Sequence, residues 1–152
     1  MSATGVENLL QPSRSLDSIK PLAVHRLRSD QEAIKTAHQI AKELEAEASA
    51  RDRERRLPRA EIELLTRSGL WGNAIPEAFG GPGVSHSTLV EVFAILAAAD
   101  PSLGQIPHNH FCVIDAIRLD GTDDQKRFYF EQVLAGKRFG NASVPLARSS
   151  TR

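Results

Sequence analysis

Cysteine is almost absent from this chain, whose one thiol belongs to Cys112. A single cysteine excludes a disulfide within the chain and a zinc site built from several thiolates, and we expect no metal site. The sequence also has no apolar run approaching the roughly 18 residues of a membrane span. Its start shows no basic segment followed by an apolar stretch, as a secretory leader would. We therefore expect a cytoplasmic protein that does not span a membrane.

An excess of charge of one sign is missing as well. Nineteen Lys and Arg residues balance nineteen Asp and Glu residues, so the chain lacks the net positive charge that favours binding to nucleic acid or to an anionic membrane. Aromatic residues make up only 5% of the sequence. A core must therefore be built mainly from Leu, Ile, Val and Ala side chains, and the length fits one domain.

Helix signals, in contrast, recur from residue 29 onward. Ser29 and Thr122 each begin a capping box, because a Glu or a Gln follows three residues later. Asp100-Pro101 is a second type of start, with Asp as the cap and Pro in the first turn. Between such starts, apolar residues repeat at intervals of three and four. The pattern predicts an all-α bundle of five helices in a domain over 29–142, with an irregular leader (1–28) and a separate tail (143–152).

Two polar stretches invite a binding function but have a simpler interpretation. The run from Arg51 to Arg56 mixes both signs of charge, which favours a solvated helix surface over a binding patch. The glycines between Gly80 and Gly83 could cradle a phosphate only after a strand and with the spacing of a phosphate-binding motif. Neither is present, so this stretch indicates a structural turn.

One polar residue falls on an apolar stripe. In the helix that starts at residue 101, rotation by about 100° per residue gathers apolar side chains on one side, and His110 lies near the middle of them. An imidazole that faces inward needs a hydrogen-bond partner. It is either a core histidine bonded to a backbone carbonyl, or a residue that points into a ligand cavity, where its pKa suits proton transfer. Both interpretations stay open at this point, and metal binding is a distant third.

Several motifs in register resemble one family. They are Ser68-Gly69-Leu70-Trp71, Ile75 to Gly83, Asp100-Pro101-Ser102, Gly121 to Lys126, and Leu134-Ala135-Gly136 through Phe139-Gly140. Together, over roughly residues 30–142, they resemble the N-terminal helical domain of acyl-CoA dehydrogenases. The resemblance implies an all-α domain that packs beside a flavin-binding β-barrel and a C-terminal helical bundle.

Two further stretches point to a branch of that family. Arg51 to Pro58 and Ser102 to Phe111 are similar to the sulfur-acquisition oxidoreductases, relatives of dibenzothiophene monooxygenase that use reduced flavin and oxygen on organosulfur compounds. In that branch a histidine on this helix faces the flavin and the substrate. The resemblance implies that His110 is catalytic and that Ile106 and Ile114, one turn to either side, contact substrate.

The resemblance ends near Asn141-Ala142, where the barrel begins in the family. Residues 143–152 do not resemble a barrel strand, so we expect a fragment of a flavin-dependent oxidoreductase, inactive alone and binding neither FMN nor FAD tightly. The alternatives are a fragment of an acyl-CoA dehydrogenase, which shares the domain, and a non-catalytic helical module that self-associates or docks onto a full-length relative. The substrate of the parent enzyme is accordingly an organosulfur compound or an acyl-CoA.

Overall fold

Five α-helices and two short 3-10 turns make up the part of the protein that the structure describes. The computed structural model describes residues 23–140, and within that part of the chain there is no strand, as the sequence predicts. None of the helices described is both long and apolar enough to cross a membrane. The elements are α1 (Asp30–Glu54), α2 (Arg59–Ser68), η3 (Leu70–Gly72), η4 (Glu77–Phe79), α3 (His86–Ala99), α4 (Pro101–Asp120) and α5 (Asp123–Leu134).

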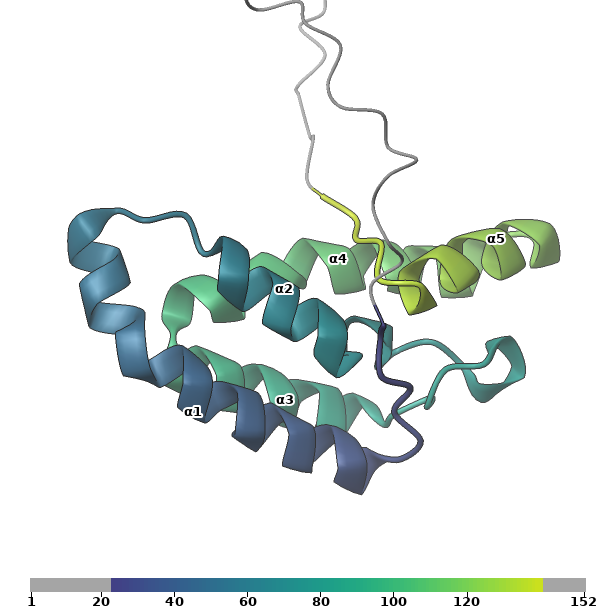
Figure 1. Cartoon of the computed structure of the whole chain (residues 1–152). Coiled ribbons are helices and arrows are strands. Elements are labelled where there is room, and N and C mark those ends of the chain that lie inside the picture. The colour runs from purple at the N-terminus through teal and green to yellow at the C-terminus, as the bar shows by residue number, and fades with distance from the viewer. Residues whose placement is uncertain (1–22, 141–152) are drawn as a thin grey trace, which may run out of the picture.

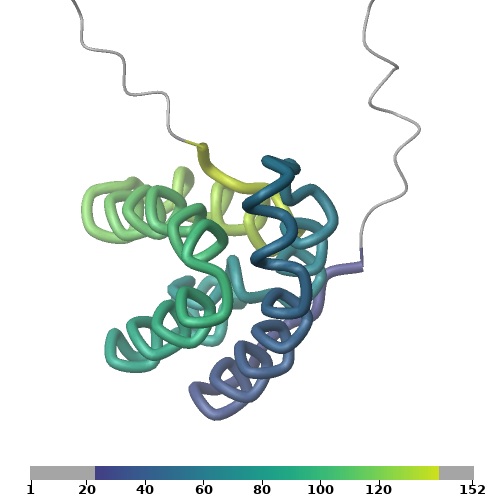
Figure 2. The backbone as a smooth tube through the Cα atoms, turned by 90° about the vertical axis from the view of Figure 1, so that its left-hand side faces the viewer, coloured from purple at the N-terminus to yellow at the C-terminus, as the bar shows by residue number. Residues whose placement is uncertain are grey.

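The helices lie in two layers. Figure 1 shows α1 alongside α3 in the lower layer, with α2, α4 and α5 above them. Figure 2, turned by 90°, shows the same separation with most helices viewed nearly end-on. The packing of α1 on α3 is the most extensive contact between elements, followed by that of α3 on α4. Gly104 permits the second contact, because a Cβ there would lie 2.6 Å from the Cβ of Ala97.

The helix ends follow the local sequence signals with one exception. Thr122 and Gln125 form the complete predicted capping box, and Gly69 ends α2 with φ of 80°, a left-handed conformation that favours glycine. Ser29 accepts the backbone N–H of Glu32 at 3.2 Å, as predicted. The Glu32 carboxylate, however, accepts the backbone N–H of Arg28 instead of that of Ser29. The first capping box is therefore only half formed.

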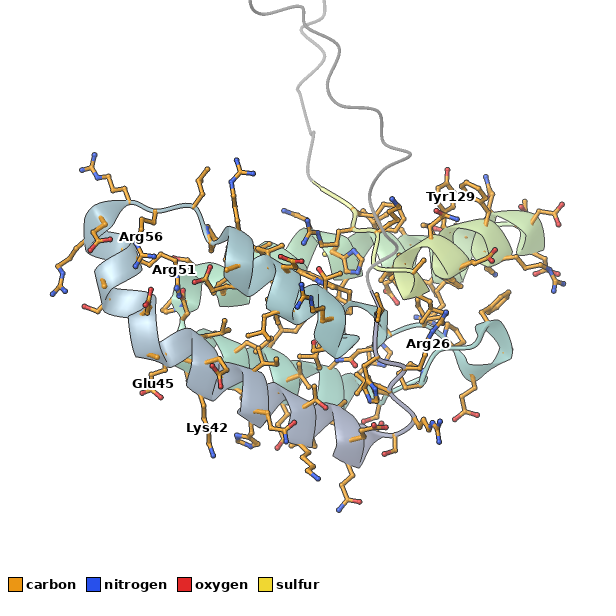
Figure 3. All side chains as sticks on the ribbon, viewed as in Figure 1. Arg26, Lys42, Glu45, Arg51, Arg56 and Tyr129 are labelled. Atoms are coloured by element: carbon orange, nitrogen blue, oxygen red, sulfur yellow. The ribbon has the colours of Figure 1, made fainter. Side chains whose placement is uncertain are left out.

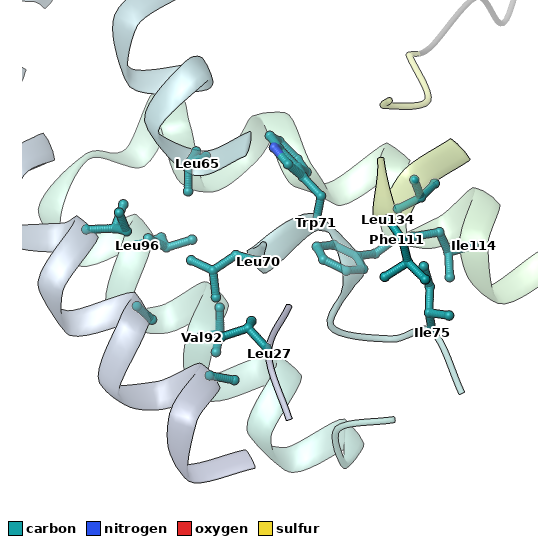
Figure 4. Packing of buried hydrophobic residues seen from close by; sticks show 14 of the residues in the cluster. Leu27, Leu65, Leu70, Trp71, Ile75, Val92, Leu96, Phe111, Ile114 and Leu134 are labelled. Carbon is teal, nitrogen blue, oxygen red and sulfur yellow. The ribbon is translucent and has the colours of Figure 1, made fainter. Parts of the chain in front are cut away.

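The core runs between the two layers and includes a residue of the predicted leader (Figure 4). Leu27 is buried, so residues 23–28, although irregular, pack against the helices. Residues 1–22 of the predicted leader, the last two residues of the predicted domain (141–142) and the whole predicted tail (143–152) lie outside the described residues. The predicted domain limits therefore stay predictions. On α1 the buried stripe is centred on Ala33, Ala37, Ile40 and Leu44.

Arg51 corrects the prediction that the charged run after residue 50 is solvated. Its side chain is 5% exposed, because α1 continues to Glu54 and position 51 lies two turns beyond Leu44 on the same stripe. The guanidinium donates to Asp100, to Glu61 at 2.7 Å and to the carbonyl of Leu44 at 3.3 Å. Figure 3 shows Arg51 at the end of the bundle where α1 turns toward α2. The prediction was right for the other residues of the run, which are exposed.

Asp100 joins this ion pair to the start of α4. Its Oδ1 accepts the backbone N–H groups of Ser102 at 2.9 Å and Leu103 at 3.1 Å, while its Oδ2 accepts from Arg51. The same carboxylate therefore caps a helix and neutralises a buried cation. Through Glu61, the pair also reaches α2. One buried cluster thus ties α1, α2 and the α3–α4 junction together.

Replacing Arg51 with Leu tests this cluster. The variant leaves the carboxylates of Asp100 and Glu61 without their cation, so we expect the free energy of unfolding to fall by about 3–5 kcal/mol. Arg53→Leu, an exposed change two residues away on α1, should alter it by no more than about 0.5 kcal/mol. Urea denaturation of the two variants measures both values, and a similar small loss in each would contradict the structural role of Arg51.

Candidate functional site

His110 occupies the inner face of α4, as its position on the apolar stripe predicts. The residue is 1% exposed, and Leu103, Pro107 and Ile114 are buried on the same side of the helix. His108, two residues earlier, is exposed. The helical rotation between positions 108 and 110 explains this difference, since residues two apart point to different sides.

Both ring nitrogens of His110 are hydrogen-bonded to backbone groups. The N–H of Phe139 donates to Nδ1 at 3.1 Å, so Nδ1 must be the unprotonated, accepting nitrogen. Nε2 then carries the proton and donates to the carbonyl of Trp71 at 2.9 Å. The ring is thus held in one tautomer, assigned from its partners. Of the two interpretations drawn from the sequence, the described residues match the core histidine bonded to a backbone carbonyl.

Aromatic rings surround the imidazole and fix its orientation. Trp71 meets it edge-on, with ring centroids 5.1 Å apart and planes 83° apart. Phe139 lies at 5.8 Å with a smaller tilt of 31°, and Phe111 follows directly on α4 at 5.2 Å. The two residues to which His110 is hydrogen-bonded are thus also its ring contacts. The arrangement joins α4, η3 and the segment after α5.

Burial controls the charge of this ring. Loss of hydration lowers the pKa of His110 from its ordinary value of 6.5 to about 4, and the positive charge of Arg138 acts in the same direction. The bond to the Trp71 carbonyl acts in the opposite direction but is the smaller effect. At neutral pH His110 is therefore uncharged, because a buried imidazolium is disfavoured.

A groove of about 800 Å³ lies beside this site, between α2 and α4. Its volume falls within the range of small-molecule sites. Leu57 is 72% exposed and Ile106 is 43% exposed, so the apolar rim of the groove faces solvent. The lining consists of apolar residues (Leu57, Pro58, Ile62, Ile106), polar residues (Arg59, Gln105, Asn109, Arg138), and Trp71, Phe139 and Gly140.

Thr66 organises the end of the groove next to His110. Its hydroxyl donates to the carbonyl of Ile62 at 2.8 Å. The same oxygen accepts the indole N–H of Trp71 at 3.1 Å and a guanidinium N–H of Arg138 at 3.2 Å. Arg138 thereby lies over the Trp71 ring, with its Cζ 5.7 Å from the ring centroid, in a cation–π contact. This end of the groove is a fixed aromatic surface with a cation above it.

The two isoleucines predicted to contact substrate separate in the structure. Ile106 lines the groove, whereas Ile114 is 0% exposed, packs in the core and is absent from the groove lining. They therefore do not line one common cavity. The buried face of α4 is rotated by about one position from the stripe that the sequence predicts. Its buried residues also include Gly104, Pro107 and Phe111. A substrate contact at Ile114 stays a prediction.

Sequence reasoning did not predict that Trp71, Phe139 and Arg138 line the groove beside His110. Trp71 is buried while also lining the groove. Phe139 and Arg138 lie 29 and 28 positions after His110, too far along the chain for any helical period to connect them. The available signal was the family resemblance, which extends through Phe139-Gly140. Contacts at this separation are set by tertiary packing.

The family of the chain follows from its match to a known domain. The sequence profile described as acyl-CoA dehydrogenase, N-terminal domain, matches residues 28–137. The chain belongs to the acyl-CoA dehydrogenase family. The match includes most of the described residues and all five helices. The resemblance inferred from the motifs is therefore confirmed, together with the all-α fold.

Individual relatives fall in the branch that the sequence suggested. The chain is 34% identical over 116 residues to dibenzothiophene monooxygenase of Rhodococcus erythropolis, covering 76% of this chain and 28% of that protein. It is 34% identical over 115 residues to a probable FMNH2-dependent monooxygenase, SfnC, of Pseudomonas putida, covering 75% and 29%. The chain thus spans little more than a quarter of the length of these relatives.

A dehydrogenase is also among the relatives. The (2S)-methylsuccinyl-CoA dehydrogenase of Cereibacter sphaeroides is 29% identical over 85 residues, which cover 56% of this chain and 16% of that protein. The monooxygenases match a longer part of the chain at higher identity. Similarity within the family is therefore greater toward the monooxygenase branch.

The low pKa of His110 makes the stability of the domain depend on pH. Between about pH 6.5 and pH 4, the unfolded chain binds a proton at residue 110 that the folded chain excludes. The stability that the neutral His110 ring contributes is therefore fully present above pH 6.5 and is lost as the pH falls toward 4. His110→Gln keeps a donor and an acceptor but does not titrate. Between pH 7.5 and 4.5, we expect the wild type to lose about 2 kcal/mol more stability than this variant.

Urea denaturation at the two pH values measures this difference, and the other ionisable groups cancel because both proteins contain them. Equal losses in the two proteins would show that the His110 ring is protonated in the folded state near pH 6.5. Histidine ¹⁵N shifts give a second measurement, with Nδ1 unprotonated and Nε2 protonated at neutral pH.

Proposed function

We propose that this domain forms one wall of the flavin and substrate pocket of a flavin-dependent oxidoreductase of the monooxygenase type. The observation that carries the proposal is the groove between α2 and α4, which ends on Trp71 above His110. The names of the most similar relatives support the reaction class. The groove has exposed residues on its rim, which fits a pocket that a second structural unit completes.

The residues at the Trp71 end suit a flavin. Phe139, which is half-buried, and the side-chain amides of Gln105 and Asn109 line this part of the groove. An aromatic ring and amides can contact the face and the polar edge of a planar ring system. When bound, the flavin would supply the redox chemistry, while the protein supplies binding and orientation. Ile62 and Ile106 offer apolar contact to a substrate beside it. FMN is the flavin that the name of the Pseudomonas relative supports.

His110 has a positioning role in this proposal. The family resemblance favours a direct catalytic role, which stays a prediction. Both of its nitrogens, however, are bonded to backbone groups, and a proton transfer to substrate would require one of these bonds to break. The neutral ring instead holds Trp71 and Phe139, two residues of the groove, in fixed positions. A cytoplasmic location is part of the proposal, and the single cysteine supports it, because disulfide-free chains are typical of reducing compartments.

A chimera tests the role of the groove. Residues 28–140 would replace the matching segment of the Rhodococcus dibenzothiophene monooxygenase, and flavin-dependent turnover would be measured. We expect the chimera to be active and Ile106→Asp to raise its KM by about tenfold or more, because a carboxylate would enter the apolar part of the pocket.

Val90→Asp is the matched control, since Val90 is an exposed aliphatic residue on α3 (67%) that is absent from the groove. If the chimera turns over substrate and Ile106→Asp leaves its KM unchanged, the groove is not part of the pocket. Activity of the chimera toward an acyl-CoA in place of an organosulfur compound would favour the second candidate, dehydrogenation, which the Cereibacter relative supports.

Exposed aromatic residues support an interaction surface next to the groove. Phe128 is 59% exposed, and its ring contacts Tyr129 at 5.2 Å, which in turn lies 5.8 Å from Phe139. Phe128 and Tyr129 are exposed and Phe139 is half-buried, and a row of aromatic rings that faces solvent favours burial against a partner. We propose that this row contacts the rest of a full-length enzyme, and that it mediates self-association when the chain is alone.

Sizing chromatography over a range of concentrations tests this surface. We expect the elution volume to shift toward that of a dimer as the protein concentration rises. Self-association should be at least about threefold weaker in Phe128→Ser, since removing a large apolar contact costs about 1 kcal/mol or more. Val90→Ser is the control. A monomer at every concentration would contradict self-association.

A further inference from the structure

The groove between α2 and α4 is unbalanced in charge although the whole chain is neutral. Among residues 23–140, the charged residues that line it are Arg59 and Arg138, and that part of the chain contributes no Asp or Glu to the lining. A neighbouring hollow on the other side of Pro58 differs, because Asp52 and Asp100 accompany its arginines. Uncompensated positive charge is therefore a specific property of the groove.

Arg138 is held in place without a carboxylate. Its Nη1 donates to Thr66 at 3.2 Å and approaches the carbonyl of Ile62 at 3.5 Å, and its Cζ lies 5.7 Å from the Trp71 ring centroid. Within residues 23–140, neither Arg138 nor Arg59 forms an ion pair, whereas Arg51, Arg56 and Arg67 each do. A guanidinium has five N–H donors, so Arg138 keeps donors available for a ligand in the groove.

The remaining lining is apolar or neutral. Ile62, Ile106 and Leu57 supply aliphatic surface, and Gln105 and Asn109 add neutral donors. We propose that the groove binds a small organic anion as substrate, with an alkyl or aryl body on the isoleucines and an anionic group, such as a sulfonate, sulfinate or carboxylate, at Arg138 and Arg59. This inference rests on the proposed function and names the substrate class of the same site.

Charge complementarity also decides against residues 141–152 as the occupant of the groove. Residues 141–152 follow Gly140, which lines the groove. They contain Arg148 and Arg152 and no Asp or Glu, so they repeat the charge of the groove instead of neutralising it. The ligand that complements two arginines must bring its negative charge from elsewhere.

The full chain offers a direct reporter for the test. Trp71 is the single tryptophan and lines the groove, so its indole N–H gives one resolved NMR signal at the site. Hexane-1-sulfonate, hexan-1-ol and hexylammonium share one alkyl body and differ in charge, and each is titrated while this signal is followed.

We expect saturable binding of the sulfonate at about millimolar concentration, on the order of tenfold tighter than that of hexanol, and none of the ammonium. Arg138→Gln and Arg59→Gln should each weaken sulfonate binding by about threefold or more while leaving hexanol binding unchanged. Arg127→Gln, an exposed change on α5 outside the groove, should have no effect. Unchanged hexanol binding shows that a variant is folded.

Equal affinity for the sulfonate and hexanol, or sulfonate binding that is insensitive to both substitutions, would overturn the inference. FMN and riboflavin, which differ by a phosphate, form a separate arm. If FMN binds more tightly than riboflavin through Arg138, and hexane-1-sulfonate does no better than hexanol, the groove holds the flavin phosphate and the substrate assignment is wrong. An inactive chimera combined with charge-selective sulfonate binding would reject the proposed function but retain the anion site.

Discussion

The double hydrogen bond of His110 is the contact on which the candidate site depends. One buried ring accepts from the Phe139 N–H and donates to the Trp71 carbonyl, so it connects η3 on one side with the segment after α5 on the other. Burial keeps the ring neutral, and neutrality is what allows one nitrogen to accept while the other donates. A charged imidazole would have two donors and would lose the bond to Phe139.

A second buried polar cluster anchors the opposite end of the same groove. Arg51 connects α1 to Glu61 on α2 and to Asp100 at the start of α4. The two helices that form the walls of the groove are thus tied to a common cation at one end and contact Trp71 at the other. Buried polar groups must be paired, so both clusters restrict how α2 and α4 can pack. The groove between them is correspondingly well defined.

Local signals predicted much of this fold but located the site only in part. Ser29, Asp100 and Thr122 begin helices as expected, because a cap acts on N–H groups two or three residues away. His110 was correctly placed on the inner face of α4. Ile106 and Ile114 were both predicted to contact substrate, yet one lines the groove and the other is in the core. A helical stripe identifies a side of a helix, and it does not identify which neighbour covers each residue.

The sequence by itself determined the all-α class, the starts of the helices and the family, since these depend on capping, on periodicity and on motifs within short stretches of chain. Tertiary structure decided that Arg51 is buried, that Arg138 lies over Trp71, and that His110 bonds to a residue 29 positions away. These contacts join segments whose separation along the chain exceeds any local period. Their partners are chosen by the packing of the whole bundle, because only the packed helices bring these segments together.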